Sequence, residues 1–294
     1  MKNVLYTCPF VPAEWIDAYG LEPMRIAPDP AGESVAAGVC PFAAAFIHAA
    51  IATDSRAVIA TTVCDQMRRS VEIIELRCDR PMFLMNVPAT WRSESAMGLY
   101  RDELARLGRF LETLGGVAPT TAKLIETMLR YDSLRAERHA EVSKPSGSGV
   151  RLALAGGPMR STDAEIFELI EQAGGTVVLN ATSGGEMTDP APFDRARLAI
   201  DPIGELVDAY FGGIPHAMRR PDNQLHEYLS RELVARGARG LIYRRYQWCD
   251  TWHGELGRLK DSLPTPVLDL VAADDESDRA YVLTRIQAFV EMLK

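Results

Sequence analysis

Three cysteines in this chain occupy positions where a thiolate can bind a soft metal. Cys64 and Cys249 each follow a short apolar run that predicts a strand, and an aspartate follows each of them. Cys40 precedes Pro41 and a helix-forming run, so we expect Cys40 to be the N-cap of a helix. Helix N-termini present backbone N–H groups and the positive end of the helix dipole, which favour the thiolate. The three thiols therefore predict a site for iron or zinc.

The spacing of these cysteines narrows the kind of metal centre. Zinc ribbons and bacterial ferredoxins use CxxC pairs, whereas Cys40, Cys64 and Cys249 lie far apart in the chain. A 4Fe–4S cluster held by three cysteines keeps one iron open to substrate. Such a cluster is our first hypothesis for the cofactor.

The two remaining cysteines leave one alternative open. Cys8 also follows a predicted strand, and its tripeptide Cys-Pro-Phe is repeated at Cys40. As a fourth ligand Cys8 would close the cluster, and a closed cluster can only transfer electrons. Two nearby prolines delay the next helix, so Cys8 is less well placed than the other three cysteines. Cys78 lies at the end of a predicted helix, and we expect it to be structural. The odd number of cysteines argues against a disulfide framework.

Two further side chains are candidate catalytic residues. Glu14 lies at a predicted helix start near the expected cleft, where it is either an ordinary first-turn acid or an acid that contacts substrate. His253 lies one helical turn after Cys249, where it is either an exposed histidine or a donor to the cluster or substrate.

The elements that position these residues follow from the hydrophobic pattern. Short apolar runs alternate with segments of helical periodicity, which predicts parallel sheets with right-handed crossovers. The expected strands are Asn3–Thr7, Met24–Ala27, Ala57–Thr62, Pro81–Val87, Arg151–Ala155, Thr176–Asn180, Gly240–Tyr246 and Pro266–Val271. Two α/β lobes of Rossmann or flavodoxin type are predicted, with the cluster in the cleft between them, at the carboxyl ends of the strands.

The middle of the chain predicts helices only. Apolar residues at helical spacing indicate a long amphipathic helix that ends at Gly115-Gly116, and a second helix is expected over Thr121–Glu141. A linker composition follows at Ser143–Gly149, and a terminal helix is expected over Ala280–Lys294. We therefore predict an N-terminal α/β lobe at 1–92, a helical connector and linker at 93–149, and a C-terminal α/β lobe with a terminal helix at 150–294.

Composition excludes several classes of partner. The net charge of the 294-residue chain is −8, which argues against nucleic acid or an anionic membrane as the main partner. No apolar run approaches the ~20 residues that span a bilayer. The first residues predict a strand rather than a signal peptide, so we expect a cytoplasmic protein.

Several segments resemble one known family, the subunits of 2-hydroxyacyl-CoA dehydratases and benzoyl-CoA reductases. The segment 11–26 is similar to the opening of these subunits, and the stretches around Cys40 and Cys64 resemble their first two cysteine motifs. Cys249 matches the third cysteine, and Leu283–Glu291 is similar to the terminal helix. This chain is shorter than the usual subunits.

The resemblance implies a specific chemistry and specific partners. Family members pair two related subunits, so a homologous or identical second subunit is expected. Each subunit usually carries a 4Fe–4S cluster on three cysteines, here Cys40, Cys64 and Cys249. An ATP-dependent 4Fe–4S activator protein supplies one electron at low potential, and the substrate is a CoA thioester or another small molecule. Dehydration and reduction both occur in the family.

Two alternatives from other functional classes stay open. The first is a non-catalytic cluster carrier that only relays electrons, which a closed site including Cys8 would favour. The second is a zinc-holding or metal-free two-lobe binding protein without redox activity.

Overall fold

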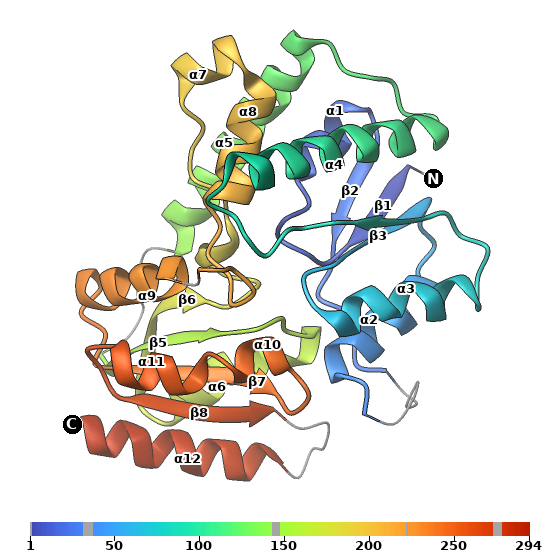
Figure 1. Cartoon of the computed structure of the whole chain (residues 1–294). Coiled ribbons are helices and arrows are strands. Elements are labelled where there is room, and N and C mark those ends of the chain that lie inside the picture. The colour runs from blue at the N-terminus through green and yellow to red at the C-terminus, as the bar shows by residue number, and fades with distance from the viewer. Residues whose placement is uncertain (1, 32–37, 143–147, 222, 273–277) are drawn as a thin grey trace.

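The computed structural model describes residues 2–31, 38–142, 148–221, 223–272 and 278–294. Within these residues the chain forms two four-stranded parallel sheets flanked by helices (Figure 1), which confirms the predicted α/β two-lobe architecture. The strands are β1 (Asn3–Tyr6), β2 (Glu22–Arg25), β3 (Ala57–Thr61), β4 (Met82–Met85), β5 (Val150–Gly156), β6 (Gly175–Ala181), β7 (Gly240–Tyr246) and β8 (Val267–Ala272). Their orders are β2-β1-β3-β4 and β6-β5-β7-β8.

All eight predicted strands are present in the described part of the chain, and β2 shows the largest shift. It begins at Glu22 and contains Pro23, whereas the sequence pattern placed the strand at Met24–Ala27. Pairing with β1 sets this register, because Asn3 lies opposite Glu22 and Tyr6 opposite Arg25. A proline is tolerated in β2 because this strand is at the edge of its sheet.

Helices cover both faces of each sheet. They are α1 (Ala13–Ala18), α2 (Pro41–Ala52), α3 (Asp65–Glu75), α4 (Glu94–Thr113), α5 (Thr121–Val142), α6 (Glu165–Gln172), α7 (Arg195–Ile200), α8 (Pro202–Val207), α9 (Asn223–Ala235), α10 (Asp250–His253), α11 (Leu256–Ser262) and α12 (Asp278–Leu293), with the short turns η1 (Ser161–Ala164), η2 (Glu186–Thr188) and η3 (Asp208–Gly212). Alternate residues of β1 and β3 pack against α1 and α4 on one face and α2 and α3 on the other. The central strands are therefore apolar on both faces.

The two helices predicted in the middle of the chain are α4 and α5. Tyr100, Leu104, Leu107 and Leu111 of α4 are fully buried in the core of the first lobe. The helix ends where Gly115 adopts a φ of +91°, a left-handed conformation that suits glycine. Of the predicted linker, residues 143–147 lie outside the described residues.

A later part of the chain returns to the first lobe. The segment 193–218, which includes α7, α8 and η3, contributes Phe193, Leu198, Phe211 and other residues to the same hydrophobic cluster as β1, α1 and α4. In Figure 1 this segment lies beside α4 and α5, with which α8 makes contact. The predicted lobe limits assign these residues to the C-terminal lobe by chain position, and those limits stay a prediction.

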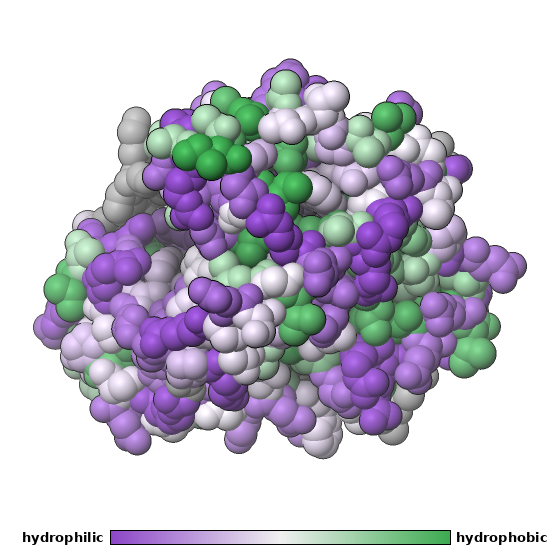
Figure 2. All heavy atoms as spheres, turned by 45° about the horizontal axis from the view of Figure 1, so that its top comes forward, coloured by the Kyte–Doolittle hydropathy of each residue, from purple (hydrophilic) through white to green (hydrophobic). Residues whose placement is uncertain are grey.

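The face of the molecule in Figure 2 is largely hydrophilic, as expected from the charged and apolar fractions of the sequence. Hydrophilic side chains dominate this face, and hydrophobic ones form small, separate patches. Among the described residues no helix is long and apolar enough to cross a membrane.

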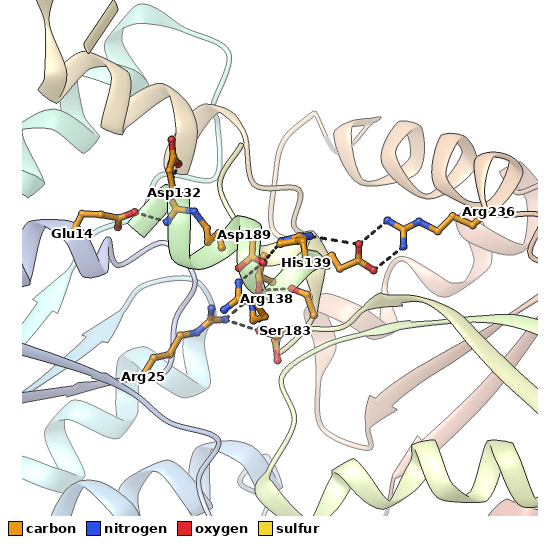
Figure 3. A network of polar contacts seen from close by, with 12 residues as sticks. Glu14, Arg25, Asp132, Arg138, His139, Ser183, Asp189 and Arg236 are labelled. Atoms are coloured by element: carbon orange, nitrogen blue, oxygen red, sulfur yellow. Dashed lines mark hydrogen bonds and ion pairs between the residues drawn. The ribbon is translucent and has the colours of Figure 1, made fainter. Parts of the chain in front are cut away.

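Polar contacts tie the two lobes together near the end of α5 (Figure 3). Arg25, at the end of β2, donates to the Ser183 carbonyl at 2.5 Å, beyond the end of β6. Arg138 and His139 of α5 both contact the Asp189 carboxylate, at 2.5 and 2.9 Å. These contacts fix the carboxyl edge of one sheet relative to the other.

A buried ion pair joins the connector to the first lobe. Glu14 of α1 is 0% exposed, and Arg135 of α5 donates to its Oε1 at 2.5 Å. The Tyr210 hydroxyl of η3 donates to Oε2 at 2.5 Å, and Arg135 also donates to Asp132 at 2.8 Å. Three segments distant in the chain thus meet at one carboxylate.

We expect Glu14→Ala to lower the free energy of unfolding by about 3–5 kcal/mol, because it leaves the mostly buried Arg135 with only one carboxylate partner. Chemical denaturation followed by circular dichroism measures this loss. Glu126→Ala is the matched control, since the exposed Lys123–Glu126 pair on the same helix contributes at most about 1 kcal/mol. Equal losses in the two variants would contradict the prediction.

Candidate metal centre between the lobes

Four of the five cysteines line one cavity between the two sheets. The cavity has a volume of about 260 Å³, and Cys8, Cys40, Cys64 and Cys249 all contribute to its wall. Apart from His216, its other residues come from the carboxyl ends of β1, β3, β5, β6 and β7 and from the starts of α2, α3 and α10. In each sheet the two central strands flank the point where strand order reverses, which is the usual position of ligand sites in such folds.

Cys64 and Cys249 occupy equivalent places in the two lobes. Each lies three residues beyond the end of its strand, Cys64 after Thr61 of β3 and Cys249 after Tyr246 of β7. Both strands stand third in the order of their sheet. Each cysteine is the N-cap of the following helix, α3 or α10, as the sequence predicted.

Cys40 reaches the same cavity from a different element. It is the N-cap of α2, and Pro41 is the first helical residue, which confirms the prediction from sequence. Helices α2 and α3 pack side by side, so their N-termini bring Cys40 and Cys64 to the same wall. Gln66 of α3 also accepts a hydrogen bond from the Cys40 backbone N–H at 3.4 Å.

Burial opposes the effect of the helix N-termini on the pKa of Cys64 and Cys249. The Met67 N–H donates to Cys64 Sγ at 3.5 Å, and the Trp252 N–H donates to Cys249, which favours the thiolate. However, loss of water raises the pKa of Cys64 to about 11 and that of Cys249 to about 12. Helix N-termini favour the thiolate, as the sequence indicated, but in the protein without metal desolvation outweighs the N–H donors. A metal must displace the protons when it binds.

The donor atoms that the cysteines bring to the cavity wall are sulfurs, which are the ligands of iron–sulfur clusters. Among the described residues, no three His, Cys, Asp or Glu side chains are grouped so that they could hold one metal ion. A single zinc ion needs its ligands at about 2.0–2.3 Å, so their atoms must nearly touch one another. In a cluster each cysteine binds a different iron, so its sulfurs need only surround a common space. A largely apolar cavity lined by sulfur atoms provides such a space.

Cys8 and Cys78 have different surroundings. Cys8 lines the cavity beyond the end of β1, together with the other three cysteines, although the two prolines that follow it had made this position less expected. Burial raises the pKa of its thiol. The equivalent position beyond β5 is Pro158, so Cys8 has no counterpart in the second lobe. Cys78 lies before β4, at the opposite edge of the first sheet, as expected of a structural cysteine.

The two candidate catalytic residues do not line the cavity. Both oxygens of Glu14 are occupied by Arg135 and Tyr210, in the core where α1 meets α5. His253 ends α10 and is exposed, although its backbone N–H donates to the Cys249 carbonyl at 2.8 Å. Helical spacing correctly put His253 one turn from Cys249, but the short helix turns its ring to solvent. These positions favour structural or surface roles for both residues.

The cavity instead contains a histidine that sequence reasoning missed. His216 is buried between Phe10 and Trp252, whose rings meet its ring edge-on at 5.6 and 5.4 Å. Its Nδ1 accepts the Met218 N–H at 3.1 Å, so the ring proton is on Nε2. Burial and the charge of Arg219 lower its pKa to about 3. His216 lies in an irregular segment without periodicity, so no pattern in the sequence pointed to it.

Comparison with solved structures adds little. Laminin-binding protein Lbp of Streptococcus pyogenes aligns with 9% identity over 99% of this chain and 98% of that chain, with a TM-score of 0.25. Laminin-binding protein Lmb of Streptococcus agalactiae aligns with 10% identity over 100% of both chains, with a TM-score of 0.28. These TM-scores are too low to support any argument about this protein. No curated protein matches the sequence.

Comparison with protein families gives a clear result. The model of the 2-hydroxyglutaryl-CoA dehydratase D-component matches residues 8–139 and 130–293, which together contain all the cysteines of the cavity. The match therefore covers nearly the whole chain and agrees with the resemblance found in its motifs. The chain belongs to the 2-hydroxyglutaryl-CoA dehydratase D-component family, and this membership supports a dehydratase-type subunit.

Proposed function

We propose that this protein is the iron–sulfur subunit of an enzyme of the 2-hydroxyacyl-CoA dehydratase type, with a 4Fe–4S cluster on Cys40, Cys64 and Cys249. One observation carries the proposal: these three helix N-caps, two from one lobe and one from the other, line a single cavity. Family membership supports the reaction class. Dehydration is the form of the reaction that the family's description favours over reduction.

The bound cluster would supply one-electron reduction at low potential and an open iron that polarises a carbonyl oxygen. The protein's own residues would hold and shield it. The Met67 and Trp252 N–H groups donate to the Cys64 and Cys249 sulfurs, where they stabilise the thiolates once the protons have left. Phe42, Val63 and Met67 keep water away from the same wall.

His216 is the polar side chain best placed to meet a substrate. With Nδ1 occupied by the Met218 N–H, its Nε2–H is a donor for a carbonyl or hydroxyl oxygen. Because its pKa is about 3, the ring is neutral at physiological pH and acts as a hydrogen-bond donor rather than as an acid.

The partners follow from the proposed chemistry. A homologous or identical second subunit would complete the enzyme, and a separate ATP-dependent 4Fe–4S activator would supply the electron. The substrate would be a CoA thioester of a 2-hydroxy acid or a related small molecule. We place the protein in the cytoplasm, where cysteines stay reduced.

A second candidate function is an electron carrier with a closed cluster. The position of Cys8 in the cavity wall favours it, since a fourth thiolate would occupy the open iron. The two functions differ in whether Cys8 is needed to hold the cluster.

Anaerobic purification and reconstitution should give a brown protein with about four irons and four sulfides per chain. We expect Cys40→Ser, Cys64→Ser and Cys249→Ser each to lose most of this iron, because each removes a ligand. Cys78→Ser is the matched control and should keep it, since Cys78 lies at the opposite edge of the sheet. Iron and sulfide analysis of the four variants measures the effect. A colourless wild-type protein would rule out the proposed cofactor.

The Cys8→Ser variant separates the two candidate functions. For an enzyme with an open iron we expect the variant to keep its cluster, and a 2-hydroxyacyl-CoA thioester to change the electron paramagnetic resonance spectrum of both proteins. Loss of the cluster in Cys8→Ser, together with a wild-type spectrum insensitive to thioesters, would instead favour the electron carrier.

The pKa of His216 predicts a pH-dependent contribution to stability. Between its ordinary pKa of 6.5 and about 3, the unfolded chain binds a proton that the folded protein does not, so acidification destabilises the wild type. In His216→Gln this contribution is absent. We therefore expect the stability difference between wild type and variant to shift in favour of the variant by up to about 1.4 kcal/mol per pH unit below 6.5. Chemical denaturation of the metal-free proteins at several pH values tests this, and a pH-independent difference would contradict it.

A further inference from the structure

Arg219 is the largest side chain that is fully buried in the described protein. It ends a tight turn in which the His216 carbonyl accepts the Arg219 N–H at 3.0 Å. Within this turn Ala217 packs into the core of the second lobe, whereas Met218 packs into the core of the first. The turn therefore carries a guanidinium into the boundary between the lobes, next to the histidine of the cavity.

In the part of the chain that the structure describes, the guanidinium of Arg219 has no carboxylate partner. It lies between the rings of Phe10 and Phe211, each with its centroid 4.4 Å away, and Nη2 donates to the Phe211 carbonyl. Its Nε and Nη1 are buried and have no hydrogen-bond partner among the described residues. Arg135 and Arg245, also largely buried, each pair with at least one carboxylate.

An unpaired buried cation strongly destabilises a folded protein unless something offsets its charge. The two aromatic faces offset part of this cost. Burial lowers the pKa of Arg219 to about 10, so the side chain is still a cation at physiological pH. Among the described residues the folded protein thus provides no carboxylate that pairs with this positive charge.

The charge of Arg219 acts on the wall of the cysteine cavity. Burial raises the pKa of Cys8, and the charge of Arg219 opposes that rise. Burial lowers the pKa of Arg219, and Tyr100 and Cys8 oppose that fall. Phe10, which lies against the guanidinium, also contacts the His216 ring. A negative charge that forms in the cavity would therefore lie near a cation that has no carboxylate partner within the described part of the chain.

We propose that Arg219 is the built-in counter-ion for the negative charge that the cavity gains when its iron–sulfur cofactor binds, and that it sets the reduction potential of that cofactor. This inference rests on the proposed function. Binding replaces thiol protons by metal and leaves a cluster with thiolate ligands, which is an anion. Addition of one electron makes it more negative, so a nearby fixed cation stabilises the reduced form and raises the potential.

The test uses the full chain reconstituted anaerobically with iron and sulfide. Two neutral variants, Arg219→Met and Arg219→Gln, are compared with Arg219→Lys, which keeps the charge. The reduction potential is measured by titration with dithionite followed by electron paramagnetic resonance. We expect a more negative potential in both neutral variants and a potential close to wild type in Arg219→Lys. Arg68→Gln is the control, because Arg68 follows Cys64 by one helical turn but is partly exposed and paired with Asp65.

A second readout uses the protein without metal. If the charge has no counter-ion before the cofactor binds, the neutral variants should melt at or above the wild-type temperature, and cofactor binding should raise their melting temperature less than it does for wild type. Failure of both neutral variants to fold would overturn the inference, since it would show that the charge is already satisfied in the metal-free protein. An unchanged potential in both would overturn it as well. A wild type that binds no cluster would instead overturn the proposed function, and the inference with it.

Discussion

Parallel strand pairing places the carboxyl ends of all strands along one edge of a sheet, and this constraint decides where this protein can do chemistry. Each lobe has such an edge, and the cavity lies where the two edges face each other. Arg25 and the end of α5 hold the edges in this position through contacts with the loop after β6. Cys249 also packs against the hydrophobic cluster that contains Cys40 and that Cys64 borders, which keeps it near them.

Burial of the cavity between the two lobes also governs the ionisation of its side chains. Loss of water keeps the thiols of Cys64 and Cys249 protonated and His216 neutral, so the metal-free cavity carries no charge of its own from these groups. Under the proposed function, binding of iron would exchange these protons for metal, which would couple occupancy to pH. Arg219 stands apart, because it is charged before any metal arrives. Among the described residues no carboxylate pairs with it, and this is the basis of the role proposed for Arg219.

Polar groups outside the cavity serve to assemble it. Glu14 joins α1, α5 and η3 through Arg135 and Tyr210, and the segment 193–218 returns to the first lobe before His216 enters the cavity. This return path places a residue from the second half of the chain between Phe10 and Trp252.

The sequence by itself determined the strands, the connector helices, the N-cap position of Cys40 and the positions of Cys64 and Cys249 after strand ends, because hydrophobic periodicity and capping are local properties. Tertiary structure alone decided which polar groups reach the cavity. Glu14 and His253 have promising neighbours in the chain but point elsewhere, whereas His216 and Arg219 lie in a segment without a pattern. Burial and side-chain direction depend on contacts between distant segments, and for that reason the ionisation of the thiols and the position of a buried cation could not be derived from local sequence.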